Sequence, residues 1–81
     1  MDVHVLFFAS LAERAGLRSE VVAVDAAATV ETLWRELESR HPALVGLPYR
    51  PLAACDQVWT AWDATLARVR EVAFVPPVSG G

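Results

Sequence analysis

The sequence predicts a single α+β domain in which a mixed β-sheet is covered on one face by one main helix. Three observations lead to this fold. Short apolar stretches near both ends of the chain have the composition of strands, and a central segment has helical periodicity. The segments also follow one another in an order that separates helix from sheet. A chain of 81 residues has room for one such domain.

The composition excludes several classes of protein. The formal net charge is −3, and a nucleic-acid-binding surface needs a basic patch, so we expect no nucleic-acid partner. The single cysteine has no partner for a disulfide, and no Cys/His spacing indicates a metal site or an intrinsically bound cofactor. No apolar run approaches the ~20 residues that cross a bilayer, and the N-terminus lacks the pattern of a signal peptide. We therefore expect a cytoplasmic protein with no membrane contact.

The N-terminal third predicts two antiparallel strands separated by a short helix. Residues 2–9 alternate imperfectly, and one apolar set is expected in the core: Val3, Val5 and Phe7. The pattern Ser10-Leu11-Ala12-Glu13 fits a capping box, so a short helix is expected to begin at Leu11. Gly16 is placed to end that helix in the left-handed conformation. Residues 20–25 follow as a β-branched strand.

The main helix is predicted to begin after Thr29, which is a typical N-cap residue. Its apolar side chains recur at i, i+3, i+4 and i+7, and this stripe should cover the sheet: Val30, Leu33, Trp34 and Leu37. The charged residues of the segment lie largely off the stripe and are interpreted as a solvated face. Pro42 limits the helix, and residues 43–51 predict a loop with apolar anchors.

The C-terminal half predicts a hairpin and a last strand. Leu52–Cys55 and Val58–Trp62 are expected to pair through a tight turn at Asp56-Gln57. Residues 63–70 fit either a helical turn or a loop. Glu71–Val75 alternates again and is predicted to be the strand that leads into the C-terminal tail.

Alternation along the strands predicts an apolar sheet face that the helix does not cover. Because side chains alternate along a strand, Phe8 and Val75 should emerge on the face opposite the core residues. Trp34 is expected in the core, whereas Trp59 and Trp62 fit either the core or an interface, and we expect Trp59 at the interface. The hydrophobic fraction of 54% also favours an exposed interface, because ordinary soluble domains have about 45–50%.

The C-terminal segment has the properties of a tail that is inserted into a partner. Pro76 and Pro77 fix φ near about −65°, so the tail should leave the domain in a fixed direction. Gly80 and Gly81 have no Cβ and can enter a passage too narrow for side chains. We therefore divide the chain into a domain, residues 1–75, and an extended tail, residues 76–81. The alternative is a frayed terminus that happens to end in two glycines.

Four segments together resemble the small subunit of molybdopterin synthase, a sulfur-carrier protein of the MoaD/ThiS family. They are FFA at residues 7–9, Thr29-Val30, Leu52-Ala53-Ala54 and EVAFVPPVSGG at residues 71–81. The resemblance spans the whole chain, and its ending is much more specific than a bare pair of glycines. It implies a ubiquitin-like β-grasp fold.

The resemblance also implies a chemistry for the tail. A ubiquitin-activating-like enzyme would use ATP to adenylate Gly81, and the product would become a thiocarboxylate that donates sulfur to a pterin precursor in molybdenum cofactor biosynthesis. The inserted tail would include Val78, Ser79 and Gly80. The large synthase subunit would contact Phe8, Trp59, Val75, Pro76 and Pro77. The chain has no internal set of nucleophile, base and oxyanion donors, so we expect it to be the sulfur-donating subunit of a sulfurtransferase complex.

Other functions use the same kind of tail. One is a sulfur carrier for thiazole synthesis or tRNA thiolation, and another is a ubiquitin-like protein modifier. The double proline and the FFA motif favour the pterin pathway, because thiazole carriers usually lack that ending. A modifier of this sequence could not build chains on its own side chains, because all seven basic residues are arginine.

A few residues remain open to more than one interpretation. Cys55 is expected to be a small buried hydrophobe rather than a sulfur relay. His4 and His41 are expected to be ordinary surface or strand-edge residues. The chain has Asp56 where the resembled family commonly has Asn, and Arg68-Val69-Arg70 where that family has Asp-Gly-Asp. Because Val69 does not readily adopt a positive φ, the turn at that point is expected to differ.

Overall fold

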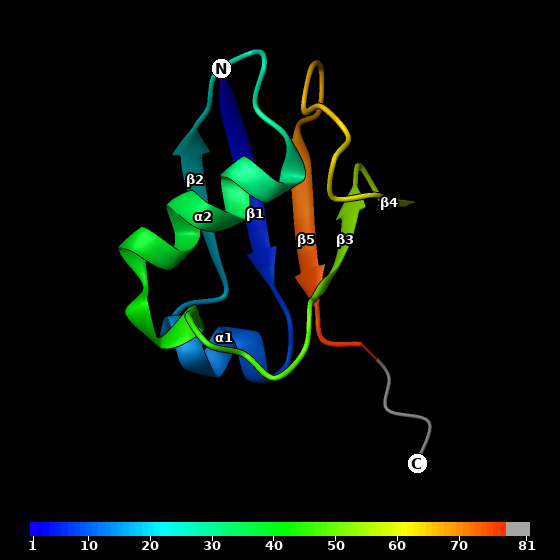
Figure 1. Cartoon of the computed structure of the whole chain (residues 1–81). Coiled ribbons are helices and arrows are strands. Elements are labelled where there is room, and N and C mark those ends of the chain that lie inside the picture. Colours follow the sequence, from blue (N-terminus) through cyan, green and yellow to red (C-terminus); the bar gives the residue numbers. More distant parts are fainter. Residues whose placement is uncertain (78–81) are drawn as a thin grey trace.

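The computed structural model describes residues 1–77, which form a five-stranded mixed sheet with one long helix across one face (Figure 1). The strand order is β2-β1-β5-β3-β4. β1 (Asp2–Phe7) pairs in parallel with β5 (Glu71–Val75), and the other neighbouring strands are antiparallel. The predicted architecture is confirmed. The residues predicted to form the inserted tail and to carry the chemistry, Val78, Ser79, Gly80 and Gly81, lie outside the described residues.

The short helix α1 (Ser10–Ala15) links β1 to β2 (Ser19–Ala23), and its start differs from the prediction. Its N-cap is Ala9, and no side chain caps it, so the predicted capping box at Ser10 is wrong. The reason is a sharp turn at Ala9, with φ 50°, in which Leu11 N–H donates to Phe8 C=O (3.0 Å). This turn places Ser10 inside the helix. At the other end, Gly16 has φ 78°, which confirms the predicted left-handed stop.

The long helix α2 (Val30–Arg40) begins as its sequence predicts. The side chain of Thr29 accepts a hydrogen bond from Thr32 N–H (3.2 Å), and Thr32 Oγ1 accepts one from Thr29 N–H (2.8 Å). These reciprocal bonds satisfy two of the free N–H groups at the start of the helix. The predicted apolar stripe is buried against the sheet in full: Val30, Leu33, Trp34 and Leu37.

A 3₁₀ turn, η1 (Pro42–Leu44), and an irregular loop lead to the hairpin of β3 (Leu52–Cys55) and β4 (Val58–Thr60). β4 is two residues shorter than predicted because the chain turns Trp62 back towards the core. The indole Nε1–H of Trp62 donates to Pro51 C=O (2.9 Å), and its ring packs edge-on against Trp34 (5.8 Å between centroids). Residues 63–70 form turns and irregular structure rather than a helix.

Two tight turns bring the hairpin next to the start of β5. Asp56 and Gln57 have φ values of 49° and 71°, and Arg68 has φ 66°. The positive φ of the second turn therefore falls on Arg68, and Val69 packs partly buried against the core. The carboxylate of Asp56 accepts hydrogen bonds from Arg70 N–H (3.1 Å) and Glu71 N–H (3.0 Å). Asp56 thus fixes the turn that the sequence left uncertain.

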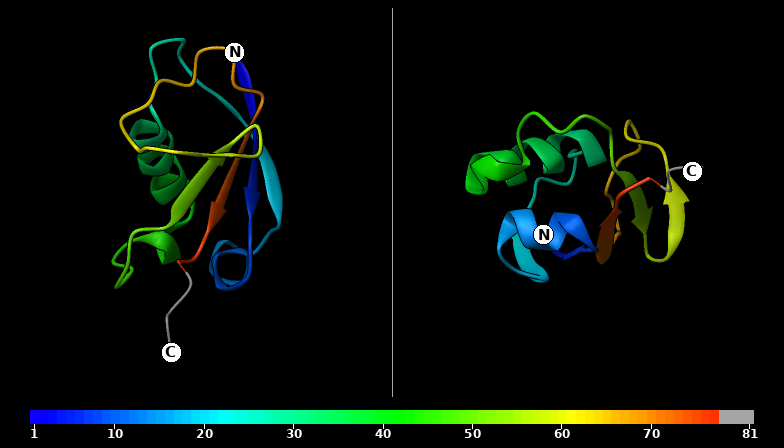
Figure 2. Two further views of the ribbon diagram at one scale, coloured as in Figure 1. Left: turned by 90° about the vertical axis from the view of Figure 1, so that its right-hand side faces the viewer. Right: turned by 90° about the horizontal axis from the view of Figure 1, so that it is seen from below.

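α2 lies against one face of the sheet (Figure 2), and the core lies between the two. The predicted inward residues of β1 and β5 are at most 3% exposed: Val3, Val5, Phe7, Val72 and Phe74. Trp34 rests on Phe74 with ring centroids 4.8 Å apart. Among residues 1–77, no helix has the length and apolar character needed to cross a membrane.

Candidate functional site

No helix lies over the sheet face opposite α2 (Figure 2), and large apolar side chains on this face are exposed. We call this surface the open face. It consists of the residues of β1, β3, β4 and β5 that point away from α2, together with Phe8, which follows β1. Its members are Leu6, Phe8, Leu52, Ala54, Trp59, Ala73 and Val75. The strand register sets them in rows, with Leu6, Ala73, Ala54 and Trp59 across the sheet, and Leu52 opposite Val75.

The backbone around Phe8 holds its side chain outward. Phe8 N–H donates to Phe74 C=O (3.1 Å), and Phe8 C=O accepts from Leu11 N–H. The N–H of Phe8 is therefore hydrogen-bonded to the sheet, and its C=O is hydrogen-bonded within the turn at Ala9. The Phe8 side chain is 46% exposed, on the face that alternation predicts. An exposed large aromatic in a fixed position is typical of an interface anchor.

Trp59 lies at the far side of the open face, on the edge strand β4. It is opposite Ala54, and its side chain is 65% exposed. Trp34 is buried and Trp62 is partly buried against the core, so the three tryptophans divide between interior and surface. The structure places Trp59, and not Trp62, on the open face. Its contact with a partner remains a prediction.

The C-terminal tail begins beside the open face. β5 ends at Val75, and Val75, Pro76 and Pro77 are each partly buried. β5 is the middle strand of the sheet, with β1 on one side and β3 on the other. The end of the sheet's middle strand thus sets where the segment leading to Gly81 starts (Figure 1). The inserted-tail assignments of Val78, Ser79, Gly80 and Gly81 fall outside the described residues.

Leu52 is a further residue of the open face that the sequence interpretation missed. It is 41% exposed and lies directly opposite Val75 across the β3–β5 ladder. Its position could have been found by extending the alternation argument from β5 to β3. That step needs the pairing of β3 with β5, which joins residues about twenty positions apart and has no local pattern.

Cys55 is buried, 8% exposed, at the end of β3 on the covered side of the sheet. Burial raises the pKa of the Cys55 thiol, so the thiol stays protonated at neutral pH. Because the thiolate is the reactive form, this environment does not activate Cys55 as a nucleophile or relay. The structure therefore supports the interpretation of Cys55 as a small buried hydrophobe.

His41 differs from the expectation of an ordinary surface residue. Its Nε2 lies 2.7 Å from Glu20 Oε1, and its ring packs edge-on against Phe7 (5.9 Å between centroids). It is thus a half-buried link between the end of α2 and β2. His4 is exposed. Within residues 1–77, no group of three His, Cys, Asp or Glu side chains is arranged to hold a metal ion.

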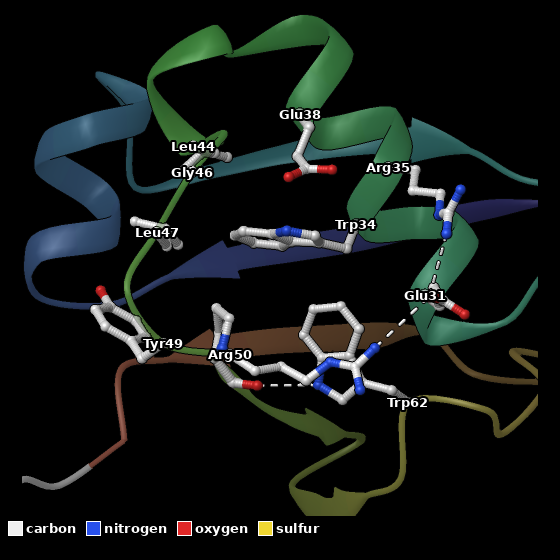
Figure 3. Close-up of a pocket in the computed structure, with 11 residues that line it drawn as sticks. Glu31, Trp34, Arg35, Glu38, Leu44, Gly46, Leu47, Tyr49, Arg50 and Trp62 are labelled. Atoms are coloured by element: carbon white, nitrogen blue, oxygen red, sulfur yellow. Dashed lines mark hydrogen bonds and ion pairs between the residues drawn. The ribbon is translucent and has the colours of Figure 1, made fainter.

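A separate hollow lies on the helix side, between α2 and the loop that precedes β3 (Figure 3). Trp34 and Trp62 line it, and the guanidinium of Arg50 lies over the Trp62 ring, 4.3 Å from its centroid. Arg50 also pairs with Glu31 (3.6 Å), which pairs in turn with Arg35 (3.4 Å). These contacts fasten the loop to α2. The hollow is on the other side of the sheet from the open face.

The fold is the ubiquitin-like β-grasp fold. Small archaeal modifier protein 1 (SAMP1) of Haloferax volcanii has a similar crystal structure, with a TM-score of 0.85 and 34% identity over 100% of both chains. The chain belongs to the ThiS family, which matches residues 5–81.

Two relatives are similar over nearly the whole chain. The molybdopterin synthase sulfur carrier subunit of Escherichia coli (strain K12) is 40% identical over 81 residues, which cover 98% of this chain and 99% of that protein. The human protein of the same name is 37% identical over 83 residues, which cover 99% of this chain and 94% of that protein.

Proposed function

We propose that this protein is the sulfur carrier subunit of a molybdopterin synthase and that the carboxyl group of Gly81 carries the sulfur. The observation that carries the proposal is the open face, which adjoins the end of β5, the strand that continues into the FVPPVSGG ending. Its support from comparison is the full-length similarity to two proteins with this name. A sulfur carrier needs two parts: a surface that binds the partner, and a terminus that delivers the sulfur.

The proposed chemistry begins with an unreactive carboxylate. The α-carboxyl group is ionised at neutral pH, because its usual pKa is about 3.5, and a carboxylate is a poor acyl donor. Attack of the Gly81 carboxylate on ATP releases pyrophosphate and forms an acyl adenylate. A persulfide then displaces AMP, and cleavage of the sulfur–sulfur bond by a thiol leaves a thiocarboxylate. A glycine acyl carbon is the least hindered one for these steps.

The partners follow from the two parts of the molecule. The large synthase subunit would cover the open face, with anchors at both of its sides: Phe8, Leu52, Trp59 and Val75. Pro76 and Pro77 would direct the tail, and Val78, Ser79 and Gly80 would enter the active site of that subunit. Adenylation would need a ubiquitin-activating-like enzyme. No catalytic group of this chain is required.

Intact mass spectrometry tests the carrier role. The chain is co-expressed with the activating enzyme, and the expected product has one oxygen exchanged for sulfur at the C-terminus. The matched control lacks Gly81 and should stay unmodified while its melting curve is unchanged. A thiocarboxylated chain is then mixed with the large subunit and the pterin precursor. Sulfur transfer that proceeds equally well with the shortened chain would refute the proposal.

The second candidate function is that of a protein modifier, and its support is the similarity to SAMP1. A modifier would form isopeptide bonds between Gly81 and lysine side chains of other proteins. The same co-expression experiment separates the two, because a modifier gives adducts of higher mass and a carrier gives the free thiocarboxylate. The paired prolines and the FFA motif favour the carrier.

A further inference from the structure

The two edges of the sheet differ in their protection against pairing with another chain. β4, at one edge, has three residues, whereas β2, at the other, has five. β2 contains neither the proline nor the lysine that commonly blocks an edge strand. In the described part of the chain, no segment lies beyond β2 in the plane of the sheet (Figure 1). β2 is therefore the edge that can accept a further strand.

The ladder between β1 and β2 shows which backbone groups of β2 face outward. Met1 and Val24 exchange both backbone hydrogen bonds (3.0 and 2.7 Å), and Phe7 N–H donates to Arg18 C=O (2.8 Å). Hydrogen-bonded and non-hydrogen-bonded pairs alternate along an antiparallel ladder. The residues between these two pairs that bond to β1 are therefore Glu20 and Val22. The remaining three direct their N–H and C=O groups away from β1: Ser19, Val21 and Ala23.

These outward groups are spaced symmetrically about Val21, so they match a second copy of β2 in the antiparallel direction. A twofold axis at Val21 pairs Val21 with itself and Ser19 with Ala23 of the other copy. All three side chains are small, and that of Val21 is 60% exposed. No like charges come to lie opposite one another in this register.

The charges at the two ends of β2 complement the same register. Arg18 precedes β2 and Asp25 follows it, both are exposed, and neither forms an ion pair within residues 1–77. The twofold axis places Arg18 of each copy opposite Val24 of the other, beside Asp25. A hollow lies there between β2 and α2, lined in part by Asp25, Leu33 and Glu36. Its apolar wall suits the alkyl stem of an arginine. The carboxylate of Asp25 suits the guanidinium, whereas that of Glu36 is already paired with Arg40 (3.0 Å).

The end of α2 also lies close to this axis. The C-terminal end of α2 projects past β2 near the start of that strand, where His41 contacts Glu20 (Figure 1). The hollow lies at the opposite end of β2. The axis therefore brings the projecting end of each copy over the hollow of the other, beside the α2 residues that line it, such as Leu33 and Glu36.

We propose that β2 is a self-association edge, along which two copies of this chain form one continuous sheet. The occupant is a second copy because the outward backbone groups, the small side chains and the end charges are all complementary to themselves. The contact lies at the opposite edge from Trp59, so the open face stays available. The inference does not depend on the proposed sulfur chemistry.

The test is the oligomeric state of the full chain by sedimentation equilibrium, from about 10 μM to about 1 mM, because a small interface is expected to be weak. The wild type should populate a dimer across this range. Val21→Pro removes an outward N–H that the fold does not use, so this variant should fold and stay monomeric. Val21→Thr keeps both the N–H and the β-branched shape and should dimerise like the wild type.

An exchange of the charges at Arg18 and Asp25 tests the register of the two β2 strands without any change at Val21. Arg18→Glu should weaken the dimer by up to about fivefold for each exposed pair, and the twofold axis repeats the pair. The double variant Arg18→Glu/Asp25→Arg should recover the association. The inference is overturned if the wild type is monomeric at about 1 mM, or if both Val21→Pro and Arg18→Glu associate as the wild type does. Loss of the dimer in Trp59→Ala alone would place the contact on the open face and also overturn it.

Discussion

On the covered face of the sheet, apolar side chains are packed under α2 and are at most a few per cent exposed; on the open face, similar side chains are 41–65% exposed at Phe8, Leu52 and Trp59. The covered face is complete within this chain, because the helix stripe supplies its partner surface. The open face has no such partner. The comparison separates residues that stabilise the fold from residues that are free to bind, although both sets are equally apolar.

Phe74→Ala should give the largest effect, because it acts on the covered face. Phe74 is fully buried against Trp34 and Trp62, and truncation of such a core aromatic costs about 3–5 kcal/mol. A domain of this size has only about 5–15 kcal/mol of stability, so the variant should be close to unfolding. Urea denaturation followed by circular dichroism measures the change. A loss below about 1 kcal/mol would contradict the role of Phe74.

Phe8→Ala should show the opposite behaviour, because Phe8 belongs to the open face. We expect a change in unfolding free energy of about 1 kcal/mol or less, since the side chain is 46% exposed. Affinity for the large synthase subunit should fall by about 2 kcal/mol, roughly thirtyfold, as for an interface anchor. Calorimetric titration measures it, and Val45→Ala is the control, an exposed residue outside the open face. Equal affinities would reject the docking surface.

Ala9→Gly should stabilise the protein slightly, and it probes the turn between Phe8 of the open face and α1. Ala9 has φ 50° and ψ −129°, a conformation that costs a residue with a Cβ about 1–3 kcal/mol. Glycine removes the strain but loses about 0.5–1 kcal/mol of chain entropy. The net gain of about 1 kcal/mol should raise the melting temperature by about 4–8 °C. An unchanged or lower melting temperature would show that the turn is not strained.

Ionisation of the Cys55 thiol should have the smallest effect on stability, and this effect appears only at alkaline pH. Because burial raises the pKa of the thiol, the folded state holds this proton more tightly than the unfolded state. The resulting stabilisation is present below the unfolded pKa and is lost as pH rises through the folded pKa. Unfolding free energies of the wild type and Cys55→Ala should therefore converge slightly towards high pH. Rapid alkylation of the folded wild type near pH 7 would show instead that the thiol is accessible and reactive.

Local patterns predicted most of the fold, and long-range contacts account for the errors. Thr29 was predicted as a cap because it is a typical N-cap residue directly before the helical stripe, and the residue that it bonds, Thr32, is only three positions away. The cap at Ser10 was predicted wrongly, since its sequence pattern carries no trace of the positive φ at Ala9. The link between Glu20 and His41 spans 21 residues and has no sequence pattern. Periodicity predicted the buried stripe of α2 and the inward residues of β1 and β5, but not the buried Val22, Ala53 and Leu66.

The candidate site was also predictable only where a local sequence pattern determines it. Alternation predicted the exposure of Phe8, but Leu52 needed the pairing of β3 with β5. Trp62 is partly buried and Trp59 is exposed because Trp62 donates a hydrogen bond to Pro51, and only the folded chain reveals this bond. The chemistry assigned to Gly81 came from resemblance and composition of the tail, and its test is the mass of the modified terminus.

The position of β5 between two hydrogen-bonded neighbours has a mechanical consequence. A pull on the tail would act along the axis of β5, so the load would fall on the ladders to β1 and β3 at the same time. Ladders loaded along the strand must break their hydrogen bonds together, whereas a terminal edge strand can be peeled away one bond at a time. A tail attached to the middle strand is thus held more firmly than one attached to an edge strand, and a pull on it is less able to unfold the domain.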